Sequence, residues 1–268
     1  MFIHTSDSGN LTVSHCFDES PKTAVFSKHM HEYHEILLLI KGDINFNIDG
    51  KLCALSPFDL LFIPASTYHV AIPATNSPYE NYVINLSTAF PSGDYGKQSF
   101  QRPHIINIAG SIHFRNLFSL LDYYHETYTD KDFETASDLL INEMLLMSLY
   151  LQRDVKGTDR LAYGDLDNSI VPKITGYIGD NLSSELNAKA IGKALNYSES
   201  YVRNIFYKKM GIGIQSYINK KKILAAHEKI MEGVSSRDAS LQFGFSEYSS
   251  FYRQYRKVFG VSPKNNKH

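Results

Sequence analysis

The chain of 268 residues has no tryptophan, only two cysteines and no long apolar run, and each absence narrows what the protein can be. Cys16 and Cys53 are isolated in the sequence, so they provide no disulfide framework and suit a reducing cytosol. No stretch of 18 apolar residues is present to span a membrane. The first residues lack a cationic stretch followed by an apolar run, so we expect no signal peptide and a cytoplasmic protein.

Signatures of catalysis are also scarce. The chain has no Gly-x-Ser-x-Gly nucleophile turn and no glycine-rich loop that could hold a phosphate. Outside one histidine-rich segment, nothing supplies a nucleophile or an acid-base pair. We therefore do not expect an enzyme. With 43% hydrophobic and 13% aromatic residues, the composition is that of a globular protein, and the length suits two domains.

The net charge of −1 hides two halves of opposite sign. Residues 170–268 carry 16 Lys and Arg against 7 Asp and Glu, whereas residues 1–169 carry 11 against 21. The C-terminal part therefore has a charge of +9 and the rest a charge of −10. This asymmetry indicates one domain that meets phosphate and another that does not.

The basic half contains one pattern twice. The first copy opens at residues 196–199 (NYSE) and closes at Gly211, and the second opens at residues 244–247 (GFSE) and closes at Gly260. In each copy, apolar residues at helical spacing precede a basic pair, which predicts a helix-turn-helix unit. One such unit reads one major groove, so two units on one chain can read successive grooves without a dimer.

Turn and cap residues support both units. Asn196 and Gly244 stand where a tight turn needs a left-handed residue. Helix N-caps are expected at Asn187, Ser198, Ser235 (with Asp238 in a capping box) and Ser246.

Residues near the start of a recognition helix reach the bases, so those that face outward there are the candidate DNA contacts. They are Ser200, Arg203 and Asn204 in the first unit and Tyr248, Ser249, Ser250 and Arg253 in the second. Arg can pair with guanine and Asn with adenine, although contact with phosphate is the commoner fate of an exposed Arg.

From about residue 170 to 264 the chain resembles the AraC/XylS family of transcription regulators. The resemblance rests on Tyr217-Ile218-Asn219, Ala226, Gly244-Phe245-Ser246, Phe251, Arg253, Phe259-Gly260-Val261 and Pro263. It implies two helix-turn-helix units joined by a long central helix, here about Ile214 to Met231, that bind double-stranded promoter DNA. The partners that it implies are a small-molecule effector and RNA polymerase.

The chain departs from the family pattern at several positions. Gly192 replaces an Ala, Lys222 replaces an Arg, and Ala239-Ser240 replaces a larger aliphatic residue followed by Ala. Small residues in the first helix of each unit should weaken its packing, by roughly 1 kcal/mol for Gly in place of Ala. We therefore expect the second unit to hold DNA more loosely.

The acidic half begins with short strands, which we expect between about residues 24 and 90. Residues 36–40 are a continuous apolar run, and Ile44, Phe46 and Ile48 alternate with polar residues before the hairpin signal Asp49-Gly50. Residues 60–63 and 82–86 continue the series, which indicates a barrel or a sandwich.

Helical periodicity replaces the strand pattern near Ile112. Two apolar stripes follow, one at Leu117, Leu120, Leu121 and Tyr124 and the other at Leu139, Leu140, Met144, Met147 and Leu151. Two interpretations of these helices remain equal: they cover the open side of the barrel, or they pair with their copies in a homodimer.

Four residues of the strand region have the types and spacing of a metal site. His29, His31 and Glu35 would point to the same side of one strand, and His69 would join them from a neighbouring strand. The spacing resembles the first cupin motif, and Pro64 and His69 meet part of the second. Such a set could bind a divalent ion of the Zn, Fe or Mn type.

Three interpretations of these residues stay open. In the favoured one, His31, Glu35 and His69 form hydrogen bonds to a small polar effector, without any required cofactor. In the second, all four residues hold a metal. In the third, the histidines are satisfied core residues, which suits His34 best because its parity differs from that of His31. The many tyrosines and phenylalanines would also suit stacking on a sugar or an aromatic effector.

Together these patterns predict an α+β protein of two domains. Residues 1–154 would be a cupin-like β-barrel with flanking helices, residues 155–169 a linker, and residues 170–268 an all-α double helix-turn-helix domain. The predicted function is a ligand-responsive transcription regulator, more in the manner of an activator. The alternatives are a cupin metalloenzyme or metal sensor with a DNA-binding tail, and a constitutive DNA-binding protein whose barrel only dimerises.

Overall fold

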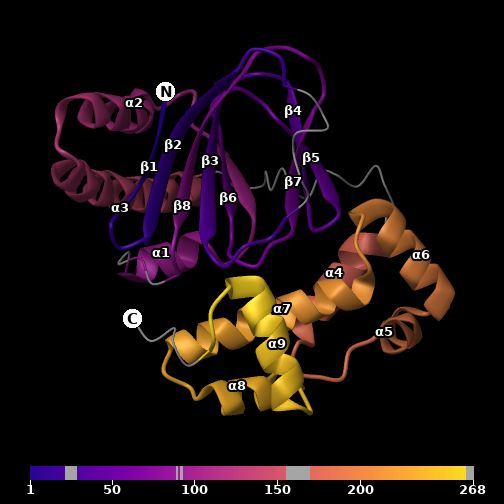
Figure 1. The fold of residues 1–268 in the computed structure, drawn as a ribbon. Helices are drawn as coiled ribbons and strands as arrows, with labels where there is room; N and C mark the ends of the chain where they lie inside the picture. The colour runs from indigo at the N-terminus through magenta and orange to yellow at the C-terminus, as the bar shows by residue number, and fades with distance from the viewer. Residues whose placement is uncertain (22–28, 89, 91–92, 155–169, 264–268) are drawn as a thin grey trace. The chain divides into compact units, whose positions relative to one another are not determined.

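The computed structural model describes residues 1–21, 29–88, 90, 93–154 and 170–263, which form two compact units, 1–166 and 167–268 (Figure 1). The linker predicted at residues 155–169 lies outside the described residues. Within the described part, no helix combines the length and the apolar character that crossing a bilayer requires.

The first unit contains two antiparallel sheets. In spatial order, the six-stranded sheet consists of β1 (Phe2–Thr5), β2 (Leu11–Asp18), β8 (Tyr79–Leu86), β3 (His34–Lys41), β6 (Asp59–Ile63) and β9 (His104–Asn107). The three-stranded sheet consists of β5 (Lys51–Leu55), β4 (Ile44–Ile48) and β7 (His69–Pro73). The two sheets face each other in Figure 1. Within the described residues they are separate hydrogen-bonded ladders that form an open sandwich, because an isolated bridge from His29 to His69 does not extend into a closed barrel.

The predicted strands are confirmed in β3, β4, β6 and β8. Ile48 pairs with Lys51 across the predicted hairpin, and the two turn residues, Asp49 and Gly50, both have positive φ, at 47° and 88°. This conformation matches the right-handed twist of the flanking strands. The sequence patterns missed β1 and β2, which precede the predicted start of the strand region at residue 24.

The described residues of the first unit also include the helices α1 (Gly93–Ser99), α2 (Ile112–Thr127) and α3 (Asp130–Asp154). Helices α2 and α3 lie along the face of the six-stranded sheet that points away from the three-stranded sheet (Figure 1). Their apolar side chains form one core with those of β2, β3, β6 and β8, which favours the covering role. The stripe prediction is wrong at Leu139, whose side chain is 69% exposed, whereas Leu140 and Met144 are buried. A second core lies between the sheets and consists of Leu37, Leu39, Ile44, Phe46, Ile48, Cys53, Leu55, Leu61, Ile63, Tyr79 and Ile105.

The second unit is helical in its described residues. Its elements are α4 (Ile170–Asp180), α5 (Ala188–Leu195), α6 (Glu199–Met210), α7 (Ile214–Met231), α8 (Ser236–Gln242) and α9 (Tyr248–Phe259). The pairs α5–α6 and α8–α9 are the two predicted helix-turn-helix units, and α7 is the central helix with the predicted bounds. The two-domain α+β prediction is therefore confirmed.

Most of the predicted caps are present. The side chains of Asn187, Ser198 and Ser235 each accept a hydrogen bond from a backbone N–H in the first turn of the following helix. Asn196 and Gly244 adopt left-handed conformations, at φ 61° and 74°. The prediction for Ser246 is wrong, because α9 starts one residue later, at an N-cap Glu247 whose side chain makes no cap hydrogen bond.

The prediction that Gly192 weakens the first unit is also wrong. A Cβ atom at Gly192 would lie 2.6 Å from the carbonyl oxygen of Tyr197, so the turn can approach α5 only because this position has no side chain. The other departures are accommodated. Lys222 is buried and donates a hydrogen bond to the carbonyl of Ser184 at 2.7 Å, and the buried hydroxyl of Ser240 donates to the carbonyl of Arg237.

Candidate DNA-binding surface and effector cavity

The recognition helix of the first unit, α6, presents the predicted polar face. Val202 and Phe206 are fully buried, and Ser200, Arg203 and Asn204 are exposed on the opposite side. The helix is fixed at its start by Ser198, which accepts a hydrogen bond from the N–H of Tyr201. Its orientation is therefore set by one apolar face and one cap, which leaves the polar face open to a ligand.

Arg203 has a partner within its own helix. Its Nε and Nη2 atoms both donate to Oε1 of Glu199, at 2.9 and 2.6 Å, and both side chains are about half exposed. An exposed pair of this kind is worth little in stability, but it holds the guanidinium along the helix surface. Any anionic ligand of Arg203 therefore has to compete with a carboxylate.

Two exposed aromatic residues beside α6 were not among the predicted contacts. The rings of Tyr197 and Tyr201 stack with their centroids 5.2 Å apart, and both side chains are more than a third exposed. Their spacing of four residues at the helix start was the available signal. They extend the outward surface of the first unit.

The recognition helix of the second unit, α9, places the predicted residues in two environments. Ser249 and Arg253 are exposed, whereas Tyr248 and Ser250 are half-buried. The hydroxyls of Tyr248 and Ser236 are hydrogen-bonded at 2.9 Å, which ties α9 to α8, and the Tyr248 ring packs near Phe251. Tyr248 thus faces inward more than the pattern predicted.

The four predicted metal-ligand residues come together in the first unit. Each of His29, His31, Glu35 and His69 offers a ligand atom within 4.8 Å of the others, and all but His29 are buried. The assumption of one continuous strand is wrong, because β3 begins only at His34. His29 reaches the site through its bridge to His69 at the start of β7, and His31 reaches it from the segment before β3.

Backbone carbonyl groups fix the protonation pattern of two of these histidines. Nδ1 of His31 lies 2.9 Å from the carbonyl oxygen of Tyr33, and Nδ1 of His69 lies 2.9 Å from that of Thr67. A carbonyl oxygen only accepts, so each Nδ1 carries a proton and each neutral ring directs a lone pair from Nε2.

Both of these lone pairs face one carboxylate oxygen. Oε2 of Glu35 lies 3.2 Å from Nε2 of His31 and 3.5 Å from Nε2 of His69. The longer distance is poor for a hydrogen bond, and Nε2 of His69 has no other partner among the described residues. The cluster therefore requires positive charge at its centre, from protons or from a cation.

Electrostatics in the cluster follow from this arrangement. Burial alone would raise the pKa of Glu35, but the hydrogen bond with His31 and the close approach of the His69 ring outweigh it and hold the pKa at about 2. Burial alone would lower the pKa of His69, but the adjacent Glu35 carboxylate raises it. Glu35 is therefore an anion that its histidine neighbours stabilise.

His34 lies apart from the cluster, as its parity predicted. Its Nδ1 accepts the N–H of Ala65 at 2.9 Å, and its ring stacks on Phe100 with centroids 4.2 Å apart. Burial, followed by the charge of His31, lowers the pKa of His34 to about 4. His34 is therefore neutral near pH 7, and its half-buried ring packs against Phe100.

A cavity of about 450 Å³ adjoins the cluster between the two sheets. Of the predicted effector residues, Glu35 and His69 line it, together with His29, whereas His31 contacts Glu35 without lining the cavity. The remaining lining was not predicted, because the alternation at Tyr82, Ile84 and Leu86 marked the opposite face of that strand. It consists of Cys16, Phe17 and Asp18 of β2, Leu37 of β3, Phe46 of β4, Ala71 of β7, and Tyr79, Asn81 and Val83 of β8.

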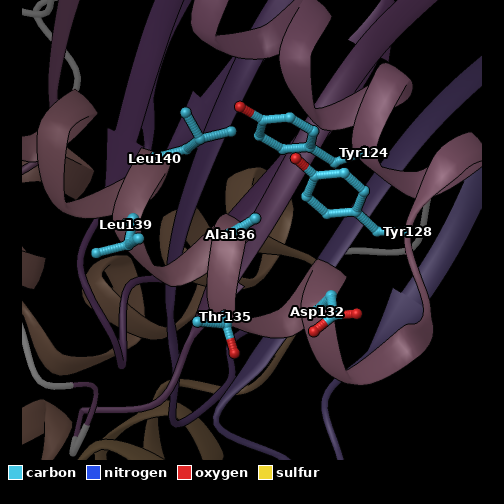
Figure 2. Close-up of a pocket in the computed structure, with 7 residues that line it drawn as sticks. All are labelled: Tyr124, Tyr128, Asp132, Thr135, Ala136, Leu139 and Leu140. Carbon is cyan, nitrogen blue, oxygen red and sulfur yellow. The ribbon is translucent and has the colours of Figure 1, made fainter.

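A shallower groove of similar volume lies on the helical layer of the same unit. Figure 2 shows the rings of Tyr124 and Tyr128, at the end of α2, beside the first turns of α3, where Ala136 and Leu140 point toward them. Leu139 points away from the two rings. The two tyrosine rings stack at 4.6 Å. The rest of the groove is lined by Asp132, Thr135 and Leu139.

Comparisons with known proteins agree with both units. Residues 191–267 match a helix-turn-helix domain family, and residues 17–85 match a cupin domain family. The thermoregulatory protein LcrF of Yersinia pestis is 23% identical over 257 residues, covering 90% of this chain and 91% of that protein. The HTH-type transcriptional activator RhaS of Pectobacterium carotovorum is 21% identical over 261 residues, with coverage of 93% and 90%. Among solved structures, fatty-acid-bound ToxT from Vibrio cholerae is 14% identical, with coverage of 95% and 94% and a TM-score of 0.40.

Proposed function

Since the chain belongs to the AraC/XylS family of DNA-binding transcription regulators, we propose that a small molecule in the cavity of the first unit controls promoter binding by α6 and α9. The observation that carries this proposal is the pairing of two exposed recognition helices with a separate unit that has a polar cluster in an amphipathic cavity. A regulator of this kind acts where the DNA is, in the cytoplasm.

In this proposal each recognition helix reads one major groove. Ser200, Arg203 and Asn204 contact the first, and Ser249 and Arg253 contact the second, while Tyr248 and Ser250 position the start of α9. Arg203 leaves Glu199 to do so, because a phosphate or a guanine edge offers it a stronger partner than an exposed carboxylate.

The DNA assignment is tested with Arg203→Ala and Arg253→Ala in the full chain. The probe is a duplex selected from a random pool by the wild-type protein. Each substitution should weaken binding by about tenfold or more, because a specific arginine contact is worth about 1–3 kcal/mol. Lys131→Ala, on an exposed site of α3 in the other unit, is the control and should bind like wild type. Wild-type affinity in both arginine variants would show that the recognition helices are misplaced.

Activation is the direction of control that we propose, with RNA polymerase as the second macromolecular partner. Relatives such as RhaS carry the name of transcriptional activators. In vitro transcription from the selected site should rise when the protein is added. A fall would make the protein a repressor.

The exposed face of α3 supports a homodimer. Ala136, Leu139, Glu143, Leu146 and Tyr150 alternate at spacings of three and four residues, which is the spacing that a second helix recognises in a coiled coil. Leu139, Leu146 and Tyr150 are 69%, 45% and 61% exposed. The groove of Figure 2 lies at the start of this stripe and would receive side chains of the partner helix.

Light scattering after size-exclusion chromatography tests the dimer. We expect twice the chain mass for wild type, and the mass of one chain for the double variant Leu139→Lys/Leu146→Lys, because charges at those positions oppose the helix contact. Leu52→Lys, at an exposed apolar site on β5, should remain dimeric. A wild-type protein that runs as a monomer at micromolar concentration contradicts the proposal.

A divalent metal ion of the Zn, Fe or Mn type is a second ligand that we propose for the first unit. The fit rests on the lone pairs of His31 and His69 that converge on Glu35, with both Nδ1 atoms held by carbonyl groups as in metal sites. His29, His31, His69 and Glu35 would hold the ion, and its charge would attract an oxygen ligand into the cavity. We propose a role in ligand capture and not in catalysis.

Elemental mass spectrometry of the purified, untagged protein tests the metal site. About one equivalent of a transition metal should be present in wild type and lost in His31→Ala/His69→Ala. His34→Ala is the matched control, because His34 lies outside the cluster. Background metal in wild type would leave a cavity whose cluster is charged by protons alone.

A further inference from the structure

The cavity of the first unit has polar groups at two separated ends. In the pairing of β3 with β8, Glu35 stands opposite Asn85, Leu37 opposite Val83 and Leu39 opposite Asn81. Four residues of extended strand span about 13 Å. Because Glu35 and Asn81 both line the cavity, its polar cluster lies at one end and Asn81 toward the other.

Asn81 has an unmet hydrogen bond. Its side chain is only 5% exposed, and its Oδ1 atom has no hydrogen-bond partner among the described residues. A buried amide oxygen without a donor is costly, so such an atom in a cavity wall indicates a ligand that supplies an O–H or N–H. The nearest strand neighbour, Cys16 of β2, stands directly opposite Asn81.

The middle of the cavity is apolar. Leu37, Val83, Phe46 and Ala71 line it between the two ends, and they come from both sheets. These walls offer no hydrogen bonds to a ligand. A monosaccharide, which carries hydroxyl groups all round, would leave several of them unpaired here.

The charge at the cluster end of the cavity determines which polar group of a ligand can bind there. The described residues that line the cavity include no Lys or Arg, so positive charge can reach a ligand only from the histidine cluster and from the ion proposed there. Asp18, the second carboxylate of the lining, pairs with Tyr79 and therefore lies beyond Asn81, away from the cluster. At the cluster end, a divalent ion held by the Glu35 carboxylate would leave a net positive charge, which favours an anionic oxygen donor.

We propose that the effector is an amphipathic organic acid with a second polar group at its far end. Its carboxylate faces the cluster of His29, Glu35 and His69, its apolar middle packs between the sheets, and its terminal hydroxyl or amine donates to Oδ1 of Asn81. This inference rests on the proposed effector role of the cavity and names the chemistry that the cavity selects.

The test compares two acids that differ only at the far end, para-hydroxyphenylpropionate and phenylpropionate. Calorimetric titration of the full chain, with its metal content measured beforehand, gives the two dissociation constants. We expect the hydroxylated acid to bind about tenfold more tightly to wild type, because it alone satisfies Asn81. Glucose, as a probe without an apolar middle, should show no binding.

Variants locate the selectivity. Asn81→Leu removes the acceptor at similar size, so the ratio of the two constants should fall to about one while phenylpropionate still binds. Asn81→Asp keeps an acceptor and should keep the preference. Asn85→Leu is the matched control, since Asn85 also has a buried, unpartnered Oδ1 but does not line the cavity. Its ratio should remain that of wild type.

Equal binding of the two acids by wild type, binding of neither, or an unchanged ratio in Asn81→Leu would each overturn the proposal. The wild-type ratio remains decisive even if the Leu variant fails to fold. DNA affinity is measured in parallel with and without the acids. A protein that binds DNA but discriminates neither acid overturns only the ligand class, whereas one that discriminates the acids with unchanged DNA affinity overturns the proposed control of promoter binding.

Discussion

At the scale of single residues, a missing side chain shapes the first helix-turn-helix unit. Gly192 lets the carbonyl of Tyr197 pass within 2.6 Å of the position that a Cβ would occupy. That carbonyl belongs to the turn that Asn196 opens in the left-handed conformation. The glycine and the asparagine therefore act together to bring α6 close to α5.

Gly192→Ala should destabilise the protein by about 1–3 kcal/mol, because the added carbon overlaps a backbone atom that cannot move alone. Gly176→Ala in α4 is the control, since a Cβ there meets no atom within 4 Å and alanine favours a helix. Denaturant unfolding of both variants measures the difference. A Gly192→Ala protein as stable as Gly176→Ala would show that the turn relaxes freely.

Arg203 shows what sequence can predict about a candidate functional residue and what it cannot. Helical spacing was enough to place it outward at the start of α6. Its bond to Glu199 depends on the rotamers of two long side chains, which spacing alone does not determine. Asn81 was missed for a different reason: its unmet hydrogen bond arises from the pairing of β8 with two other strands.

At the scale of elements, the two recognition helices start in different ways. Ser198 caps α6 through its side chain, whereas α9 begins at Glu247 without such a bond and is held by the contact of Tyr248 with Ser236 instead. The two copies of the sequence pattern are therefore not equivalent in how they are fixed. The sequence repeat predicted the helices, but not this difference between their starts.

Ser198→Ala should cost about 1 kcal/mol of stability, the usual effect of losing an N-cap side chain. Ser246→Ala, at the equivalent position of the second copy, should lower the free energy of unfolding by much less than Ser198→Ala does, because Ser246 caps no helix. Thermal unfolding without DNA compares the two. Equal losses would place a cap at Ser246 after all.

Among the strands, features that depend on neighbouring residues were predicted, whereas contacts between residues distant in sequence were not. Alternation and the Asp49-Gly50 turn were enough to predict β4 and its hairpin. The histidine cluster was predicted from a parity argument that fails, since β3 starts at His34. The cluster forms nevertheless, because His29 pairs with His69 across two segments that are distant in sequence.

At the scale of the whole molecule, the charge of the chain is divided between its two parts. Residues 170–268 carry a net charge of +9 and residues 1–169 a net charge of −10. The basic unit attracts DNA, and the acidic unit opposes indiscriminate attachment of the rest of the chain to the same polyanion. The predicted domain boundaries stay a prediction, because residues 155–169 lie outside the described residues.

DNA affinity of the full chain should therefore fall steeply with salt. If six or more phosphates are contacted, affinity should drop roughly a thousandfold between about 50 and 200 mM salt, because each contact releases counterions. Fluorescence anisotropy of a labelled duplex across this range gives the slope. A nearly flat response would mean that phosphate contacts contribute little and that the basic unit owes its charge to another role.

Strand β8 lies between the cavity of the first unit and the helices α2 and α3. Consecutive residues of β8 point alternately toward the cavity and toward the helices. Asn81 lines the cavity, and the next residue, Tyr82, donates its hydroxyl hydrogen to Asp122 of α2, which also contacts Nδ1 of His15 at 2.8 Å. Neighbouring side chains of a strand point to opposite faces of the sheet. A displacement of the backbone at Asn81 would therefore also displace Tyr82. A single peptide bond therefore separates a residue that lines the cavity from a residue that is hydrogen-bonded to α2.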